Sequence, residues 1–166
     1  MEQDFVARAR KDEKAPKGWP AALVMFHVGM WRERMRDSLA AAADGREYKA
    51  PGTADEINDP ELAAGIGTPL SDAAARADHL LTEIADLLER VGDKKVQWFT
   101  APSGADAVLR NSYSHPRSHI CAYLAENGEV VEARRLLDEA LRRLAELSAP
   151  EYVTKVLTTL RESLPA

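Results

Sequence analysis

The stretch VVEARRLLDEALRRLAEL, residues 130–147, gives the clearest indication of the fold. Its Val, Ala and Leu residues recur at spacings of three and four, whereas Glu, Asp and Arg occupy the positions between them. This period is that of an α-helix with one apolar face. The stretch therefore predicts a helix that buries a single face against neighbouring elements.

Three further long stretches have the same period, and a short amphipathic helix follows Pro150. They cover residues 19–43, 71–91 and 108–127, with Ser71 as the candidate N-cap of the second. Strand character is confined to Val96–Phe99, which has no evident partner. Helices that each bury one face favour an all-α protein, an antiparallel four-helix bundle. The length of 166 residues favours one domain over residues 1–166.

Residues 46–69 separate the first two long helices and contain three Pro and three Gly. This composition predicts a long crossover loop without a helix. Long loops in compact domains commonly serve a function, so we expect this crossover to shape a binding pocket.

Composition excludes several classes of protein. A net charge of −5 provides no basic surface for a nucleic-acid backbone, so we predict no nucleic-acid partner. One cysteine, Cys121, cannot form an internal disulfide or a thiolate metal site, which favours a reducing, cytoplasmic location. The apolar run Ala21–Trp31 is about half the length of a membrane span and is interrupted by His27, so we predict neither a membrane segment nor a secretory signal.

His115 and His119 are four residues apart in the third long helix. This spacing places both imidazoles on one helical face, one turn apart, where they can reach a single metal ion. The pair alone is equally compatible with two exposed histidines without a function. Both interpretations remain open on spacing alone.

His27 lies on the apolar face of the first long helix, with Val24 and Trp31 among its neighbours. An inward imidazole needs partners for its ring nitrogens, because an unsatisfied buried group costs about 1–3 kcal/mol. One interpretation is a core histidine bonded to a carbonyl or a tyrosine. The other is a third ligand for a metal at His115 and His119, which would leave an open coordination position, as catalytic sites do.

Other polar residues near the pair have weaker signals. His79 is predicted to be a solvated surface residue, and Cys121 a small packed apolar residue. Asn111, Tyr123 and Glu126 continue the helical face around the pair and are candidates to orient the metal-binding histidines. Capping or surface solvation is the simpler explanation of these three positions.

The pattern Gly18-Trp19, His27 followed by Trp31, and NSYSHPRSHICAYLAENG at residues 111–128 resembles the DinB-like (DinB/YfiT-like) superfamily of metal-dependent helical-bundle proteins. The resemblance extends from about residue 18 to residue 147. In that superfamily an early His and a later H-x-x-x-H pair bind a divalent metal. The resemblance therefore implies His27, His115 and His119 as ligands and an up-down-down-up four-helix bundle with a long crossover.

Two features depart from the family pattern. Only a short segment, residues 4–12, is available for the usual first helix, so we expect that helix to be short. Pro116 lies inside the H-x-x-x-H pair and is tolerated only if the ligand helix begins there, with Ser114 or His115 as its cap.

The family resemblance implies Zn²⁺ or Ni²⁺ as the cofactor and a small-molecule substrate. Some members are similar to S-transferases or isomerases that use a low-molecular-weight thiol, others to hydrolases, and members often form homodimers. A divalent ion bound by three neutral imidazoles would activate water or a thiol for either chemistry. The alternative is a non-enzymatic ligand-binding or dimerisation module with structural histidines, and the catalytic residues and the substrate stay unknown.

Overall fold

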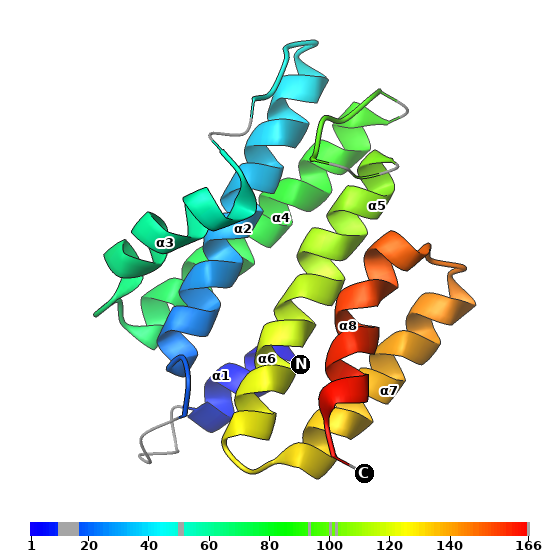
Figure 1. The fold of residues 1–166 in the computed structure, drawn as a ribbon. Helices are drawn as coiled ribbons and strands as arrows, with labels where there is room; N and C mark the ends of the chain where they lie inside the picture. Colours follow the sequence, from blue (N-terminus) through cyan, green and yellow to red (C-terminus); the bar gives the residue numbers. More distant parts are fainter. Residues whose placement is uncertain (10–16, 50–51, 93, 100, 102, 166) are drawn as a thin grey trace.

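The computed structural model describes residues 1–9, 17–49, 52–92, 94–99, 101 and 103–165. The regular elements in these ranges are all helical, and no strand occurs there, so the predicted all-α class is confirmed. Figure 1 shows the arrangement. In chain order the elements are α1 (Glu2–Ala9), α2 (Ala21–Ala43), α3 (Ala54–Gly65), α4 (Leu70–Val91), α5 (Gly104–Leu109), the π-helix η1 (Arg110–Ser114), α6 (His115–Glu126), α7 (Val130–Glu146) and α8 (Glu151–Ser163).

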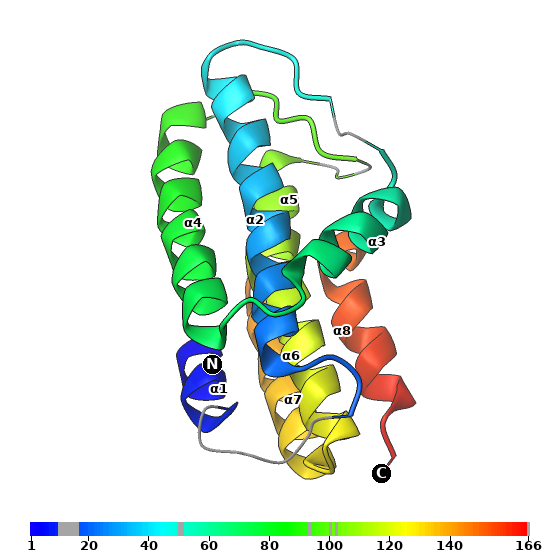
Figure 2. The ribbon, with the colours of Figure 1, turned by 90° about the vertical axis from the view of Figure 1, so that its left-hand side faces the viewer.

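Helices α2 and α4 pack along their whole lengths and run in the same direction (Figures 1 and 2). Gly29 faces Ala77. Further along both helices, Arg36 binds Glu83 at 3.1 Å. A parallel pair requires a long connection, which residues 44–69 provide. An entirely antiparallel description is therefore wrong for this pair. Helix α4 also begins after Pro69 and not after the predicted N-cap Ser71.

Helices α5, η1 and α6 follow one another without a break and run opposite to α2. Trp31 near the middle of α2 accepts a hydrogen bond from Asn111, whereas Gly18, just before α2, lies against Glu126 at the end of α6. Pro116 stands in the first turn of α6, as predicted. Ser114 precedes it but makes no capping hydrogen bond. The π-helical turn leads into α6, which lies beside α2.

Helices α7 and α8 form an antiparallel hairpin that covers α6 and η1. Arg161 of α8 binds Asp138 of α7 at 2.6 Å, and Arg134 donates to the carbonyl of Leu164 at 3.2 Å. Leu137 and Leu144 on the inner face of α7 are fully buried, as the sequence period predicts. The hairpin thereby packs an apolar face against α6.

The crossover contains a helix, so the prediction of an unstructured loop is wrong for residues 54–65. Thr53 and Glu56 form a capping box: Thr53 accepts from the Glu56 amide, and Glu56 accepts from the Thr53 amide. This motif starts a helix by satisfying the free amides of its first turn. Ile57, one residue later, is buried against α2 and anchors the helix. Figure 2 shows α3 lying across α2.

Helix α1 packs on α4 and α6 at the end of the molecule where α2 begins. It is short, as predicted, and residues 10–12 of the predicted segment lie outside the described residues. Its Glu2 accepts two hydrogen bonds from Arg32, at 2.7 and 2.9 Å. The Arg32 side chain is fully buried. A buried guanidinium thus joins α1 to the core.

The buried apolar residues form two clusters that meet along α2. One includes Val24 and Val28 and extends to α6, α7 and α8. The other includes Met30 and Met35 and extends to α4 and Trp98. His27 lies where the two clusters meet. Within the described residues, no helix is long and apolar enough to cross a membrane.

Candidate metal centre

The three candidate histidines come together in space. His27 projects from α2, and His115 and His119 project from the first two turns of α6, which faces α2. The Nε2 atom of His115 lies 3.0 Å from Nε2 of His27 and 3.1 Å from Nε2 of His119. One ligand nitrogen from each of the three lies within 4.8 Å of the other two. These residues therefore lie close enough to hold a metal ion.

The spacing of the nitrogens fits a small divalent ion. A tetrahedral ion with metal–nitrogen distances of about 2.0–2.1 Å places its ligand nitrogens about 3.3 Å apart. The two closest Nε2 pairs differ from this value by only a few tenths of an ångström. Three protein ligands leave one tetrahedral position open, and catalytic zinc sites share this feature.

Hydrogen bonds alone cannot satisfy this cluster. A neutral imidazole has one N–H donor and one acceptor lone pair on its two ring nitrogens. The single lone pair of His115 Nε2 can accept one good hydrogen bond, yet it faces the Nε2 atoms of both His27 and His119. In the tautomer that carries the proton on Nε2, His115 can donate this proton to His27 or to His119 but not to both. A cation among the three lone pairs satisfies all of them at once.

Burial keeps the three imidazoles neutral. It lowers the pKa of His27 to about 3, with a contribution from the neighbouring His119, and the pKa of His119 to about 4. The pKa of His115 is also far below its usual value, because of burial and the nearby His119 and His27. Neutral imidazole is the form that binds metals, so protons do not compete with an ion near pH 7.

Aromatic packing orients the imidazole rings. Trp19 stacks on His119 with ring centres 5.5 Å apart and meets His27 edge-on at 5.1 Å. The buried Nδ1 atoms of His27 and His115 have no hydrogen-bond partner. Metal-bound histidines usually donate this second N–H to a carboxylate or a carbonyl. Among the described residues, ring contacts therefore supply the orientation, and no carboxylate accepts a hydrogen bond from these two Nδ1 atoms.

The π-helical turn η1 positions the start of α6. The Asn111 side chain, 4 % exposed, donates to the carbonyl of Trp31 at 3.0 Å and so ties η1 to α2. Arg32 donates to the carbonyl of Ser112 at 3.5 Å. Pro116, four residues after Ser112, has no amide proton to donate to this carbonyl. Single π-helical turns often occur at functional sites. This one fixes His115 relative to His27.

An open cavity of about 500 Å³ extends from the three histidines. Helix α3 contributes to its wall, because Asn58 accepts a hydrogen bond from the Trp31 indole at 3.0 Å. The crossover therefore shapes the pocket, as the sequence predicted, although it does so with a helix. The polar residues in the wall besides the histidines are Asn58, Arg110, Asn111 and Tyr152. The site is thus a mostly aromatic pocket with the histidines at one side.

The remaining sequence candidates lie elsewhere or have other roles. His79 is exposed, as predicted, and is 3.5 Å from Glu83. Cys121 is buried, also as predicted, and burial raises the pKa of its thiol to about 12. Tyr123 packs edge-on against Phe5, and Glu126 is exposed. Asn111 lines the cavity with all three histidines, whereas Tyr123 and Glu126 line a smaller cavity of about 250 Å³ that includes His119.

Several cavity residues were not singled out from the sequence, among them two aromatic residues and two residues from η1 and α8. Trp98 and Phe99 belong to the segment Val96–Phe99, whose apolar and aromatic character predicts a strand but whose aromatic pair lines the pocket. Phe99 has a φ of 36°, a strained conformation for a residue other than glycine. Arg110 and Tyr152 come from η1 and α8. Only the fold brings these helices together, so no local sequence signal identifies the two residues.

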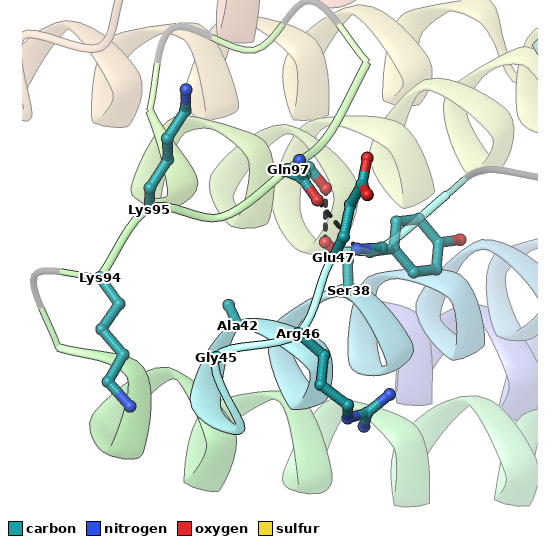
Figure 3. Close-up of a pocket in the computed structure, with 9 residues that line it drawn as sticks. Ser38, Ala42, Gly45, Arg46, Glu47, Lys94, Lys95 and Gln97 are labelled. Atoms are coloured by element: carbon teal, nitrogen blue, oxygen red, sulfur yellow. Dashed lines mark hydrogen bonds between the residues drawn. The ribbon is translucent and has the colours of Figure 1, made fainter.

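A second cavity, of about 350 Å³, lies at the C-terminal end of α2 (Figure 3). Its basic residues Arg46, Lys94 and Lys95 point in different directions in Figure 3. Arg46 binds Asp44, and Lys94 donates to the carbonyl of Ala43 at 2.7 Å. These cations are therefore engaged separately and do not converge on one ligand. The cavity contains no cluster suited to catalysis among the described residues.

Comparisons with models of protein families, with curated proteins and with solved structures find no match to this chain. The fold and the site therefore define its class in structural terms. It is a helical protein with a three-histidine cluster that can hold a metal ion at the side of an aromatic cavity.

Proposed function

We propose that the protein is a metal-dependent enzyme of the DinB-like type, in which Nε2 atoms of His27, His115 and His119 hold one Zn²⁺ or Ni²⁺ ion. The observation that carries the proposal is the convergence of three neutral imidazole nitrogens on one point beside an open cavity. Structural zinc sites use four protein ligands, whereas this cluster offers three. The free position faces a space that admits a small molecule.

The order and direction of the helices support the DinB-like assignment. Helix α1 runs opposite to α2, since Glu2 binds Arg32 while Arg8, one to two turns later, binds Glu129 beyond α6. Helices α2 and α4 are parallel, and α5–α6 runs opposite to both. The short α1, α2, α4 and α5–α6 therefore follow an up-down-down-up order. The long crossover lies between α2 and α4, the second and third members of this order.

The proposed chemistry is activation of water or of a low-molecular-weight thiol. A divalent ion bound by three neutral ligands keeps its charge and lowers the pKa of a bound water or thiol toward 7. Among the described residues, no carboxylate lines the cavity, so the chain places no acidic general base there. Trp19, Trp31 and Trp98 give the cavity large apolar walls, although it is open to solvent. Arg110 and Asn111 remain to orient a substrate.

A metal-exchange experiment tests this proposal. The purified protein is stripped with a chelator, reloaded with one equivalent of Zn²⁺ or Ni²⁺, and assayed for hydrolysis of p-nitrophenyl acetate and for its thiolysis by added cysteamine. We expect a metal-dependent rate in at least one of the two assays. His115→Ala should abolish this rate and the bound metal together. His79→Ala, at an exposed histidine, is the matched control and should change neither. Activity that persists in the chelated protein, or metal retained by His115→Ala, would refute the proposal.

A further inference from the structure

The cavity is exceptionally aromatic for this chain. All three tryptophans, Trp19, Trp31 and Trp98, line it, together with Phe99 and Tyr152. Trp31 is the centre of the wall: its ring lies 6.2 Å from Trp98 and 5.9 Å from Phe99. Asn58 accepts a hydrogen bond from the Trp31 indole N–H, and this bond fixes the orientation of the ring. Flat, rigid walls of this kind favour a flat apolar ligand that stacks on or meets the rings edge-on.

Arg110 is the one lining residue with a permanent charge among those that the structure describes. Its guanidinium lies over the Tyr152 ring at 5.0 Å, and Nη1 donates to the Tyr152 carbonyl at 3.0 Å. No ion pair with a described carboxylate is found for Arg110, and the nearby Asp106 instead accepts from Ser103 at 2.7 Å. One of its five N–H donors is thus engaged, while no described carboxylate forms an ion pair with the guanidinium.

A half-buried guanidinium without a counterion attracts an anion from the solvent side of the cavity. Arginine is suited to this role because its planar donors match the two oxygens of a carboxylate. The bond to Tyr152 and the ring beneath it hold the guanidinium in place, which lowers the entropy lost when a ligand binds. The three tryptophans would then contact the rest of the ligand.

We propose that the cavity takes a flat, apolar small molecule that bears a carboxylate, and that Arg110 binds this carboxylate. The assignment rests on the proposed function, because it gives a substrate class to the same cavity. If Arg110 binds the carboxylate, the protein should prefer a carboxylate ligand even when no metal ion is bound. This expectation determines the design of the test.

The probes are 2-naphthylacetate and its neutral counterpart 2-naphthylacetamide, which differ in charge and hardly in shape. Calorimetry measures the affinity of the whole protein for each, first after removal of metal by a chelator and then with one equivalent of Zn²⁺. The metal-free arm separates Arg110 from the attraction of an ion for carboxylates. In this arm we expect the acid to bind about tenfold or more tightly than the amide.

Arg110→Met should reduce the preference for the acid to less than about twofold. Arg117→Met is the matched control, because Arg117 also lies over a tyrosine ring, Tyr113 at 3.5 Å, and donates to its carbonyl at 3.0 Å, but does not line the cavity. This control should keep the full preference. Arg110→Lys retains the charge and should keep part of the preference, which covers the case in which Arg110→Met does not fold.

Equal affinities of the wild-type protein for acid and amide would overturn the inference, as would a preference that survives in Arg110→Met, or no binding of either probe. These outcomes are distinct from failure of the proposed function. A protein that binds no metal but prefers the acid through Arg110 retains the substrate class without the metal chemistry. A protein that binds one metal ion and shows no preference retains the metal site alone.

Discussion

His27 is the residue at which the metal-binding and structural interpretations differ most. Its Nδ1 atom is buried without a partner among the described residues, and its Nε2 atom lies 3.0 Å from Nε2 of His115. A purely structural core histidine would satisfy these nitrogens, because leaving a buried polar group unpaired costs about 1–3 kcal/mol. Under the proposed function, a cation bound by the three Nε2 atoms would stabilise the folded state through linkage.

Replacement of His27 tests this reasoning. His27→Leu should lower metal affinity by more than about 100-fold, since even the outer partners of metal ligands contribute about 10–100-fold. The same change should leave the metal-free protein as stable as the wild type or up to about 1 kcal/mol more stable, because an apolar side chain replaces an unsatisfied one. Metal titration and urea unfolding with chelator measure the two effects. Strong destabilisation of the metal-free variant would favour a structural histidine.

The lowered pKa values also predict how stability depends on pH. In the unfolded chain these histidines take up protons near pH 6.5, whereas in the folded protein His119 does so only near pH 4 and His27 near pH 3. Between these values the unfolded state binds more protons, so acidification lowers the free energy of unfolding, by about 1.4 kcal/mol per pH unit for each histidine.

Urea unfolding of the metal-free protein from pH 7 to pH 5 measures this slope. His27→Leu should reduce the slope by the contribution of one histidine, and the exposed His79→Ala should not change it. Stability that is constant over this range would show that the imidazoles are not held neutral by the fold.

At the scale of the elements, the long helices could be predicted from the sequence, because one face of each is buried and the period is visible. The helix α3 was missed because Pro60 and the surrounding glycines masked it, although the Thr53-x-x-Glu56 capping box was readable. The π-helical turn could not be predicted, since it depends on contacts of Asn111 and Arg32 with other elements. The histidine triad was accessible from spacing, face and family resemblance, whereas Arg110 and Tyr152 meet only in the fold.

Helix α3 ends in close contact with α2 at Gly65. A Cβ atom there would lie 2.4 Å from the Phe26 ring, so Gly65→Ala should force a shift and destabilise the protein by about 1–3 kcal/mol. Gly29→Ala is the contrasting variant, because its Cβ would meet Ala77 at an ordinary 3.8 Å in the middle of α2. It should stabilise the protein by about 0.5–1 kcal/mol. Thermal unfolding distinguishes the two, and a harmless Gly65→Ala would mean that α3 does not pack tightly here.

At the scale of the whole molecule, the chain terminus is connected to the site. Glu2 binds the fully buried Arg32, and Arg32 also reaches the carbonyl of Ala77 in α4 and of Ser112 in η1. One guanidinium therefore joins α1, α2, α4 and the turn that precedes His115. The predicted homodimer stays a prediction, because the structure contains one chain.

Removal of the charge on Glu2 should lower the free energy of unfolding. Glu2→Gln leaves the Arg32 guanidinium buried without a counterion, and loss of one partner of such a pair typically costs about 3–5 kcal/mol. Because the Glu2 side chain is partly exposed, we expect Glu2→Gln to lower the free energy of unfolding by a smaller amount, about 2–3 kcal/mol. Asp4→Asn is the matched control on the same helix, since Asp4 is exposed and pairs only with the N-terminal amine at 3.6 Å. Chemical denaturation that gives the same loss for both variants would refute a specific role for Glu2.

The central claim is that Nε2 atoms of three histidines on two helices hold one divalent ion. Crystals of the protein reloaded with one equivalent of Zn²⁺ or Ni²⁺ test it most directly, with anomalous diffraction data collected on both sides of the metal absorption edge. We expect one anomalous peak about 2.0–2.1 Å from Nε2 of His27, His115 and His119, with the open coordination position toward the aromatic cavity. No peak at this position, or a peak whose ligands exclude any of the three histidines, would contradict it.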